Sequence, residues 1–201
     1  MTNILNKRIG NFSKAADIFQ TILIFLIALL VPTFLGGVIK NVFGATSIVA
    51  ANTQLIVGSI VNCALIISAL NLKGWKNILG VVTMPSISTI LSGYVFQTAS
   101  LYMAWMIPAI WIGNFALVYA YKFIMFSKNK NYFLAGITGI LVKVAVIASC
   151  FMIFKWIGIF PEKLVSTLQI AMTSTQLITA VIGAVLAYVI YFAEKKTLKN
   201  N

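Results

Sequence analysis

Lys143 is the side chain whose position in this 201-residue sequence points most clearly to a chemical role. It lies near the middle of an apolar stretch, where a lysine costs about 2.5–3.5 kcal/mol on membrane-insertion scales. The three acids, Asp17, Glu162 and Glu194, lie near the ends of such stretches and are not placed to pair with it. Two explanations stay open. Lys143 binds an anionic or carbonyl-bearing ligand, or it bonds backbone carbonyls or packs at a partner interface.

Amide side chains are the next candidates, because each costs free energy in an apolar segment unless it faces other helices. Gln169, Thr173 and Gln176 follow one another at intervals of four and three residues, and small residues continue this stripe to Ala187. The polar half predicts a ligand pocket and the small half predicts close helix packing. Glutamines that bond neighbouring helices are the alternative explanation.

Further polar and aromatic side chains fall toward one end of the expected helices. Gln54 and Asn62 share a helical face, and Asn114 lies near the middle of another apolar stretch. Tyr102 and Trp105 are equally compatible with pocket lining and with an aromatic belt at the membrane interface. The residues that we expect to bind a substrate are Lys143, Gln176, Asn114, Trp105, Tyr102, Gln54, Gln97, Asn62, Thr173 and Gln169.

The composition excludes several kinds of chemistry. The sequence has no His, its acids are far apart, and it lacks the GxxxxGK[S/T] loop of ATP-hydrolysing proteins. Cys63 and Cys150 both fall in apolar stretches and form no metal-binding pattern. Apart from Lys143, the Lys and Arg residues are scattered over loops and tails, which does not favour nucleic-acid binding. We therefore expect that the protein is not an enzyme and that it binds no metal, no other cofactor and no nucleic acid.

The elements that carry these residues are predicted to be membrane-spanning helices of a single domain, residues 1–201. Apolar residues make up 61% of the chain and charged residues 9%, with a mean hydropathy of +1.00. These values lie outside the range of soluble domains. One spanning helix takes roughly 20 residues, which leaves room for six. The expected fold class is an all-α integral membrane protein, a bundle of six transmembrane helices with spans at about 18–39, 48–72, 77–96, 101–121, 132–154 and 166–193.

The distribution of basic residues predicts the orientation of the bundle. Eleven basic residues fall on the side of the two termini, and two or three fall on the other side. The positive-inside rule then makes both termini cytoplasmic. The Lys- and Asn-rich tails favour a bacterial cell membrane. The glycine-rich segment 36–47 joins the first two spans on the outside, and we expect either an ordinary connection or a mobile lid there.

Taken together, these features resemble the membrane-embedded substrate-binding subunits, or S-components, of energy-coupling factor (ECF) importers. The resemblance covers the whole chain in its length, its number of spans and its orientation. More local likenesses are the segments QLIVGSIVN (54–62), MIPAIWIGN (106–114), LVK (141–143) and TQLITAVIGAVLAY (175–188).

The resemblance implies a subunit that captures a small micronutrient, such as a vitamin or its precursor, from outside the cell. It implies two kinds of partner besides the lipid bilayer, a transmembrane T-component and two ATPase subunits that supply the energy. It also implies that Lys143, Asn114 and Gln176 line the pocket, with Tyr102 and Trp105 near them. The substrate itself is not identified by these segments.

One departure from the family leaves other functions open. Many S-components carry an Ala-x-x-x-Ala motif in the first span for contact with the T-component. Here the residues four positions after Ala15 and Ala16 are Phe19 and Gln20, so the motif is missing. The first alternative is a stand-alone facilitator or channel lined by the same polar stripes. The second is a membrane scaffold in which the Gln and Asn side chains join helices and no small molecule binds.

Overall fold

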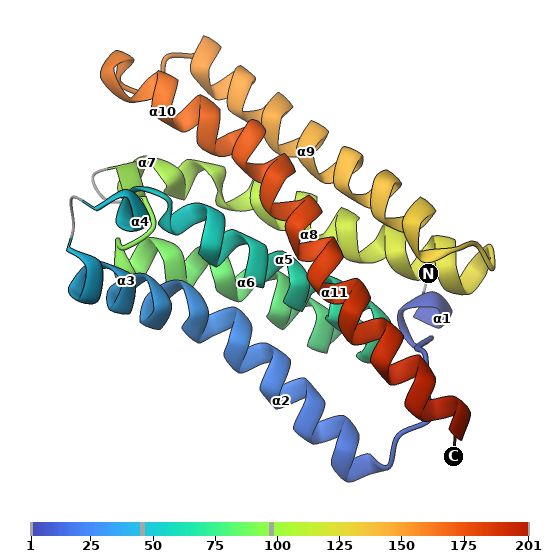
Figure 1. The fold of residues 1–201 in the computed structure, drawn as a ribbon. Helices are drawn as coiled ribbons and strands as arrows, with labels where there is room; N and C mark the ends of the chain where they lie inside the picture. Colours follow the sequence, from blue (N-terminus) through green and yellow to red (C-terminus); the bar gives the residue numbers. More distant parts are fainter. Residues whose placement is uncertain (1, 45–46, 97–98, 201) are drawn as a thin grey trace.

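The computed structural model describes residues 2–44, 47–96 and 99–200 of the chain. Within these ranges every regular element is a helix, and the structure contains no strand. Figure 1 shows the helices packed side by side as one bundle. The helices are α1 (Thr2–Leu5), α2 (Lys14–Leu30), η1 (Val31–Leu35), α3 (Gly36–Phe43), α4 (Ile48–Ala51), α5 (Thr53–Asn71), α6 (Trp75–Ser92), α7 (Ser100–Met103), η3 (Ala104–Met106), α8 (Ile107–Tyr121), η4 (Lys122–Ser127), α9 (Tyr132–Trp156), α10 (Glu162–Met172) and α11 (Ser174–Asn200).

Five helical stretches are long and apolar enough to cross a membrane, which makes the chain a multi-pass helical membrane protein. Large apolar side chains on α2, α9 and α11 stay exposed on the outside of the bundle, among them Phe19, Ile137 and Val189. Such a surface is suited to lipid rather than to water. The five stretches are Lys14–Phe43, Thr53–Asn71, Ser100–Ser127, Tyr132–Trp156 and Glu162–Leu198.

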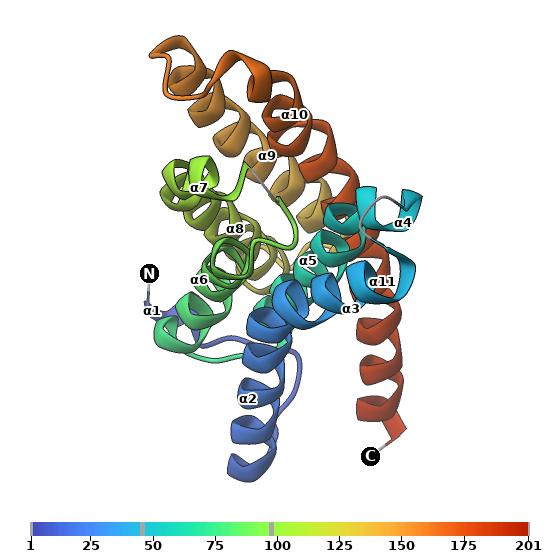
Figure 2. The same cartoon turned by 90° about the vertical axis from the view of Figure 1, so that its left-hand side faces the viewer.

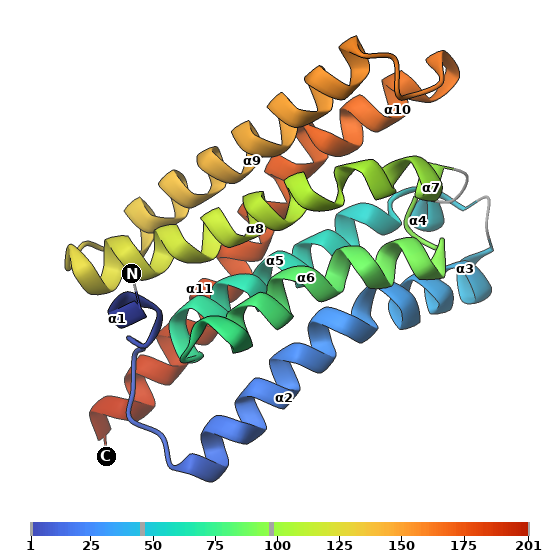
Figure 3. The same ribbon diagram turned by 180° about the vertical axis from the view of Figure 1, so that it is seen from behind.

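The helices pack mainly in pairs, α5 with α11, α8 with α9 and α2 with α6. Both termini lie at one end of the bundle, and α3, α4, α7 and α10 lie at the other (Figure 1). We call these the terminal end and the far end. Figure 2 views the bundle from the far end, and Figure 3 shows α6 and α8 from behind.

Two glycines let neighbouring helices approach each other closely. A Cβ atom on Gly183 of α11 would lie 2.5 Å from the Cβ atom of Asn62 on α5. A Cβ atom on Gly113 of α8 would lie 3.2 Å from the backbone oxygen of Lys143 on α9. Both crossings thus require glycine. They bring Asn62 and Lys143 from their own helices toward the centre of the bundle.

The segment 36–47 differs from the expected connection or lid. Its first part forms α3, which continues the first span through the π-helical turn η1, so this span is helical from Lys14 to Phe43. Gly36 has a packing role, because a Cβ atom there would lie 2.9 Å from the Cβ atom of Tyr94. Close contact with Tyr94 therefore explains a glycine that the sequence alone associates with flexibility.

The last expected span is divided into two helices. α10 ends at Met172, and Thr173 has backbone angles of φ −118° and ψ −90° that no helix contains. The side-chain hydroxyl of Thr173 donates to the backbone oxygen of Gln169 at 2.6 Å. The polar stripe expected along one helix is therefore broken at Thr173, and residues on its two sides do not share a face.

The terminal end of the bundle is closed by the chain that precedes α2. The ammonium of Lys122 is fully buried and donates to the backbone oxygens of Lys7 and Leu72 at 2.6 and 3.0 Å. The amide of Gly74 donates to the backbone oxygen of Leu5 at 3.1 Å. These bonds fix the N-terminal segment across the ends of α5 and α8.

Candidate functional site

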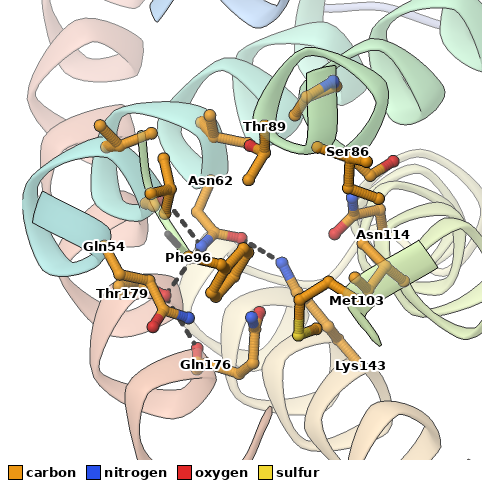
Figure 4. Close-up of a pocket in the computed structure, with 17 residues that line it drawn as sticks. Gln54, Asn62, Ser86, Thr89, Phe96, Met103, Asn114, Lys143, Gln176 and Thr179 are labelled. Carbon is orange, nitrogen blue, oxygen red and sulfur yellow. Dashed lines mark hydrogen bonds between the residues drawn. The ribbon is translucent and has the colours of Figure 1, made fainter. Parts of the chain in front are cut away.

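A cavity near the far end of the bundle gathers polar side chains from five helices. Its volume is about 80 Å³. Figure 4 shows the labelled residues arranged around this space, with the ring of Phe96 in the middle of the view. The polar lining residues are Gln54, Asn62, Ser86, Thr89, Asn114, Lys143, Gln176 and Thr179.

Lys143 is the centre of a hydrogen-bond network that crosses from α9 to α5 and α11. Its ammonium donates to Oδ1 of Asn62 at 2.5 Å, and only 2% of the residue is exposed. The Asn62 amide donates to the backbone oxygen of Gly58 at 2.8 Å and to the hydroxyl of Thr179 at 3.2 Å. Both N–H donors of the Asn62 amide are thus used, whereas Lys143 has two N–H groups without a partner among the described residues.

Asn114 brings an unused acceptor to the same cavity. Its Nδ2 atom donates to the backbone oxygen of Val82 at 3.4 Å. Its Oδ1 atom is buried and has no hydrogen-bond partner within the described residues. A buried carbonyl without a partner costs about 1–3 kcal/mol. A ligand with an N–H or O–H group would therefore gain a ready acceptor at Asn114.

Gln54 and Gln176 stabilise the helix break beside the cavity. Their side-chain amides donate to the same backbone oxygen, that of Ala171, at 3.1 and 3.4 Å. Ala171 lies in the last turn of α10, where backbone oxygens have no partner within the helix. These two glutamines hold α5, α10 and α11 together, and their Oε1 atoms stay available at the cavity wall.

The electrostatics of the cavity favour a ligand with negative charge or a strong acceptor. Among the described residues that line it, Lys143 is charged and none is acidic. Apolar faces are supplied by Phe96, Met103 and Ile110. Trp111 stands behind the wall and donates from its indole nitrogen to the hydroxyl of Ser86 at 2.7 Å. This combination can bind and orient a small molecule that has both polar and flat apolar parts.

The structure brings together half of the residues expected from the sequence. Lys143, Gln176, Asn114, Gln54 and Asn62 all line the cavity.

The other expected residues lie elsewhere. Trp105 is 58% exposed on the outside, and Tyr102 packs against the apolar cluster formed by α7, α9 and α10. Thr173 lies at the break between α10 and α11, and Gln169 accepts a hydrogen bond from Lys155 at 3.1 Å. Gln97 lies outside the described residues.

Several lining residues are absent from the sequence-based set. Ser86 and Thr89 are three residues apart on α6 and face the cavity next to Pro85. Thr179 lies one turn after Gln176 on α11. Its position three residues from Gln176 is the signal that could have identified it. Phe96 follows the end of α6, and no helical spacing from a polar residue could have identified it.

Within the described residues, no three His, Cys, Asp or Glu side chains gather where a metal ion could be held. Cys63 and Cys150 are both free and partly buried.

Protein-family models, curated proteins and solved structures contain no match to this chain. The geometry of the cavity is therefore the basis for any functional conclusion.

Proposed function

We propose that this protein captures a small solute in the far-end cavity as the substrate-binding membrane subunit of an ECF-type importer. The observation that carries the proposal is the pair of unused groups in one cavity, the N–H groups of Lys143 and the Oδ1 atom of Asn114. A solute with an anionic or carbonyl group and a neighbouring N–H or O–H donor would satisfy both. A vitamin, or a precursor of one, has this chemistry.

The closed terminal end supports capture rather than passage through a pore. Between the cavity and the terminal end, the centre of the bundle is filled by fully buried apolar side chains such as Leu65, Leu70 and Leu117. Lys122 and the N-terminal segment cover the end beyond them. A solute that enters from the far end would therefore stop at Lys143 unless the helices rearrange.

The proposed arrangement has six spans, with α6 as the third, and both termini in the cytoplasm of a bacterial cell. The cavity would then open to the outside. The chain has no ATP-binding loop. Release inward would depend on a transmembrane T-component and two ATPase subunits, which would rearrange the helices around the bound solute.

The proposal is tested by affinity purification of the tagged protein in mild detergent from a bacterium that encodes ECF components. Mass spectrometry identifies the proteins and the small molecules that are retained. We expect a T-type membrane protein, two ATPases and one small polar molecule in near-equal amounts. An S-component of known substrate, purified in parallel, shows that such complexes survive the procedure. Recovery of this chain alone, next to an intact control complex, would contradict the importer assignment.

Liposomes that contain this protein alone separate capture from facilitated passage. They are incubated with a radiolabelled mixture of water-soluble vitamins, and the label is measured on the protein and in the lumen. Capture predicts retention of label in proportion to the amount of protein, without accumulation inside. Label that enters the lumen faster than into protein-free liposomes would indicate a facilitator instead.

A further inference from the structure

A basic hollow at the terminal end has no part in the proposed capture of a solute. Arg8, Lys130 and Lys195 line it together with Asn129 and Tyr191, and its volume is about 530 Å³. Lys130 and Lys195 are exposed. No acid is among its described lining residues, although Arg8 itself is paired with Asp17. The hollow therefore presents two lysines whose charge is not neutralised nearby.

An apolar groove runs along the bundle between α9 and α11. Its volume is about 380 Å³, and residues such as Ile137, Ile140, Val181 and Val185 form its walls. Both helices belong to stretches that are able to cross a membrane. The groove therefore lies where acyl chains of the bilayer surround the protein.

Three tyrosines connect the basic hollow to the apolar groove. Tyr191 lines the hollow, and Tyr132 and Tyr188 line the groove. The ring of Tyr132 is stacked on that of Tyr191, with centroids 5.4 Å apart. The Tyr132 hydroxyl donates to the backbone oxygen of Ala184 at 2.7 Å, which fixes α9 to α11 at this point. The hollow and the groove therefore adjoin each other at these three tyrosines.

Tyr121 forms part of the inner wall of the groove. The residue is fully buried, and its ring lies against that of Tyr132, with centroids 5.1 Å apart. The groove is therefore lined mainly by apolar side chains and aromatic rings, which suits an acyl chain.

We propose that the hollow and the groove together form a binding site for one anionic phospholipid. The phosphate lies beside Lys130 and Lys195, and an acyl chain follows Ile137 and Val181 along the groove. Basic pockets between helices on the cytoplasmic side of a membrane are suited to such head groups. The site is separate from the solute cavity and does not depend on its function.

The charge of the site is tested by native mass spectrometry of the purified full chain with phosphatidylglycerol and phosphatidylcholine of matched acyl chains. We expect tighter binding of phosphatidylglycerol. The double variant K130Q/K195Q should lose about 30-fold in affinity for it, because each lysine near a membrane surface contributes roughly 5-fold. K73Q/K76Q removes the same charge at the same end, outside the hollow, and should keep the preference. Equal binding of both lipids by the unaltered protein would overturn the proposal.

The groove is tested with one pair of variants. Val181→Trp fills it and should weaken the binding of both lipids about equally, whereas Ile182→Trp, at an exposed neighbouring position, should not.

Two further outcomes would overturn the proposal in favour of another occupant. Inorganic phosphate or glycerol 3-phosphate bound as tightly as the lipid, and equally by Val181→Trp, would indicate a site for free phosphate. Loss of a co-purified membrane protein in Val181→Trp, with lipid binding unchanged, would indicate a protein partner in the groove. Thermal unfolding of each variant shows that a loss of binding is not a loss of fold.

Discussion

At the scale of the residue, the decisive feature is that Lys143 has three N–H donors and makes one hydrogen bond in the part of the chain that the structure describes. Lys143→Met keeps most of the side-chain volume and removes the charge. The buried charge costs about 2.5–3.5 kcal/mol, and its loss is largely offset because Oδ1 of Asn62 loses its partner, which costs about 1–3 kcal/mol. We therefore expect the free energy of unfolding in detergent to change little. The solute that co-purifies with the unaltered protein should be lost.

The matched control for this variant is Lys155→Met, on the same helix at an exposed position. It should retain the solute in full. A Lys143→Met protein that still retains the solute would give Lys143 a structural role. A protein that fails to fold would show that its bond to Asn62 is worth more than the burial cost.

The unpaired Oδ1 atom of Asn114 predicts that a substitution there stabilises the fold and weakens solute binding. Asn114→Leu removes a buried carbonyl without a partner, so the solute-free protein should be stabilised by about 1–3 kcal/mol. The increase in melting temperature on adding the solute should become smaller than in the unaltered protein. Both quantities come from the same thermal unfolding series, with Asn77→Leu as an exposed control. A destabilised Asn114→Leu protein would show that the weak bond to Val82 outweighs the unpaired oxygen.

Single residues differ in how well the sequence reveals them. Lys143, Asn114 and Asn62 could be selected because a charge or an amide in an apolar stretch is expensive and needs a partner. Ser86 and Thr179 could not be selected on this ground, because small hydroxyl groups bond a backbone oxygen of their own helix, here those of Thr83 and Thr175. A hydroxyl of this kind is tolerated anywhere along a span, so Thr179 could be found only through its spacing from Gln176, and Ser86 could not be found at all.

At the scale of the element, the crossing of α5 and α11 depends on Gly183. Gly183→Ala places a Cβ atom 2.5 Å from the Cβ atom of Asn62 and 2.8 Å from the amide nitrogen of Cys63. Since both are fixed in α5, the helices must move apart, and we expect a loss of about 1–3 kcal/mol. Gly80→Ala in α6 is the control. Its Cβ atom meets the Phe25 ring at 3.4 Å, an ordinary contact, and the variant should be neutral or slightly stabilised.

Melting temperatures of the two variants in the same detergent decide this prediction. Gly183→Ala should also lose the retained solute, because Asn62 is part of the cavity. Equal melting temperatures for Gly183→Ala and Gly80→Ala would mean that α5 and α11 do not cross as closely as described.

The helices themselves could be predicted well, whereas their interruptions could not. Long apolar stretches predict helices because the backbone must bond internally in lipid. The break at Thr173 depends instead on Gln54 and Gln176, which bond the backbone oxygen that the break leaves free. Likewise α3 continues the first span because Gly36 packs against Tyr94. Such contacts between distant segments leave no pattern in the local sequence.

At the scale of the whole molecule, the number of spans depends on α6. Its 18 residues include Lys76 and Asn77 near the start and several hydroxyl side chains. Its 18 residues are therefore less apolar than the helical stretches that qualify as membrane spans. It packs against α2, α5 and α8, and Ile78, Val81 and Val82 are fully buried. Because protein covers much of its surface, and Ser86 and Thr89 face the cavity, α6 needs less hydrophobicity than a helix surrounded by lipid.

Whether α6 crosses the membrane can be predicted and tested by labelling single cysteines. They are introduced into a protein whose Cys63 and Cys150 are replaced by Ala. Lys73 precedes α6 and Leu91, which is 82% exposed, lies near its end. If α6 crosses the membrane, a membrane-impermeant maleimide should label Leu91→Cys on intact cells and Lys73→Cys only after permeabilisation. Lys163→Cys on α10 is the control for the outer side. Labelling of Lys73→Cys and Leu91→Cys under the same condition would mean that α6 returns to the side from which it starts. The chain would then have five spans with its termini on opposite sides, which contradicts their common end of the bundle (Figure 1).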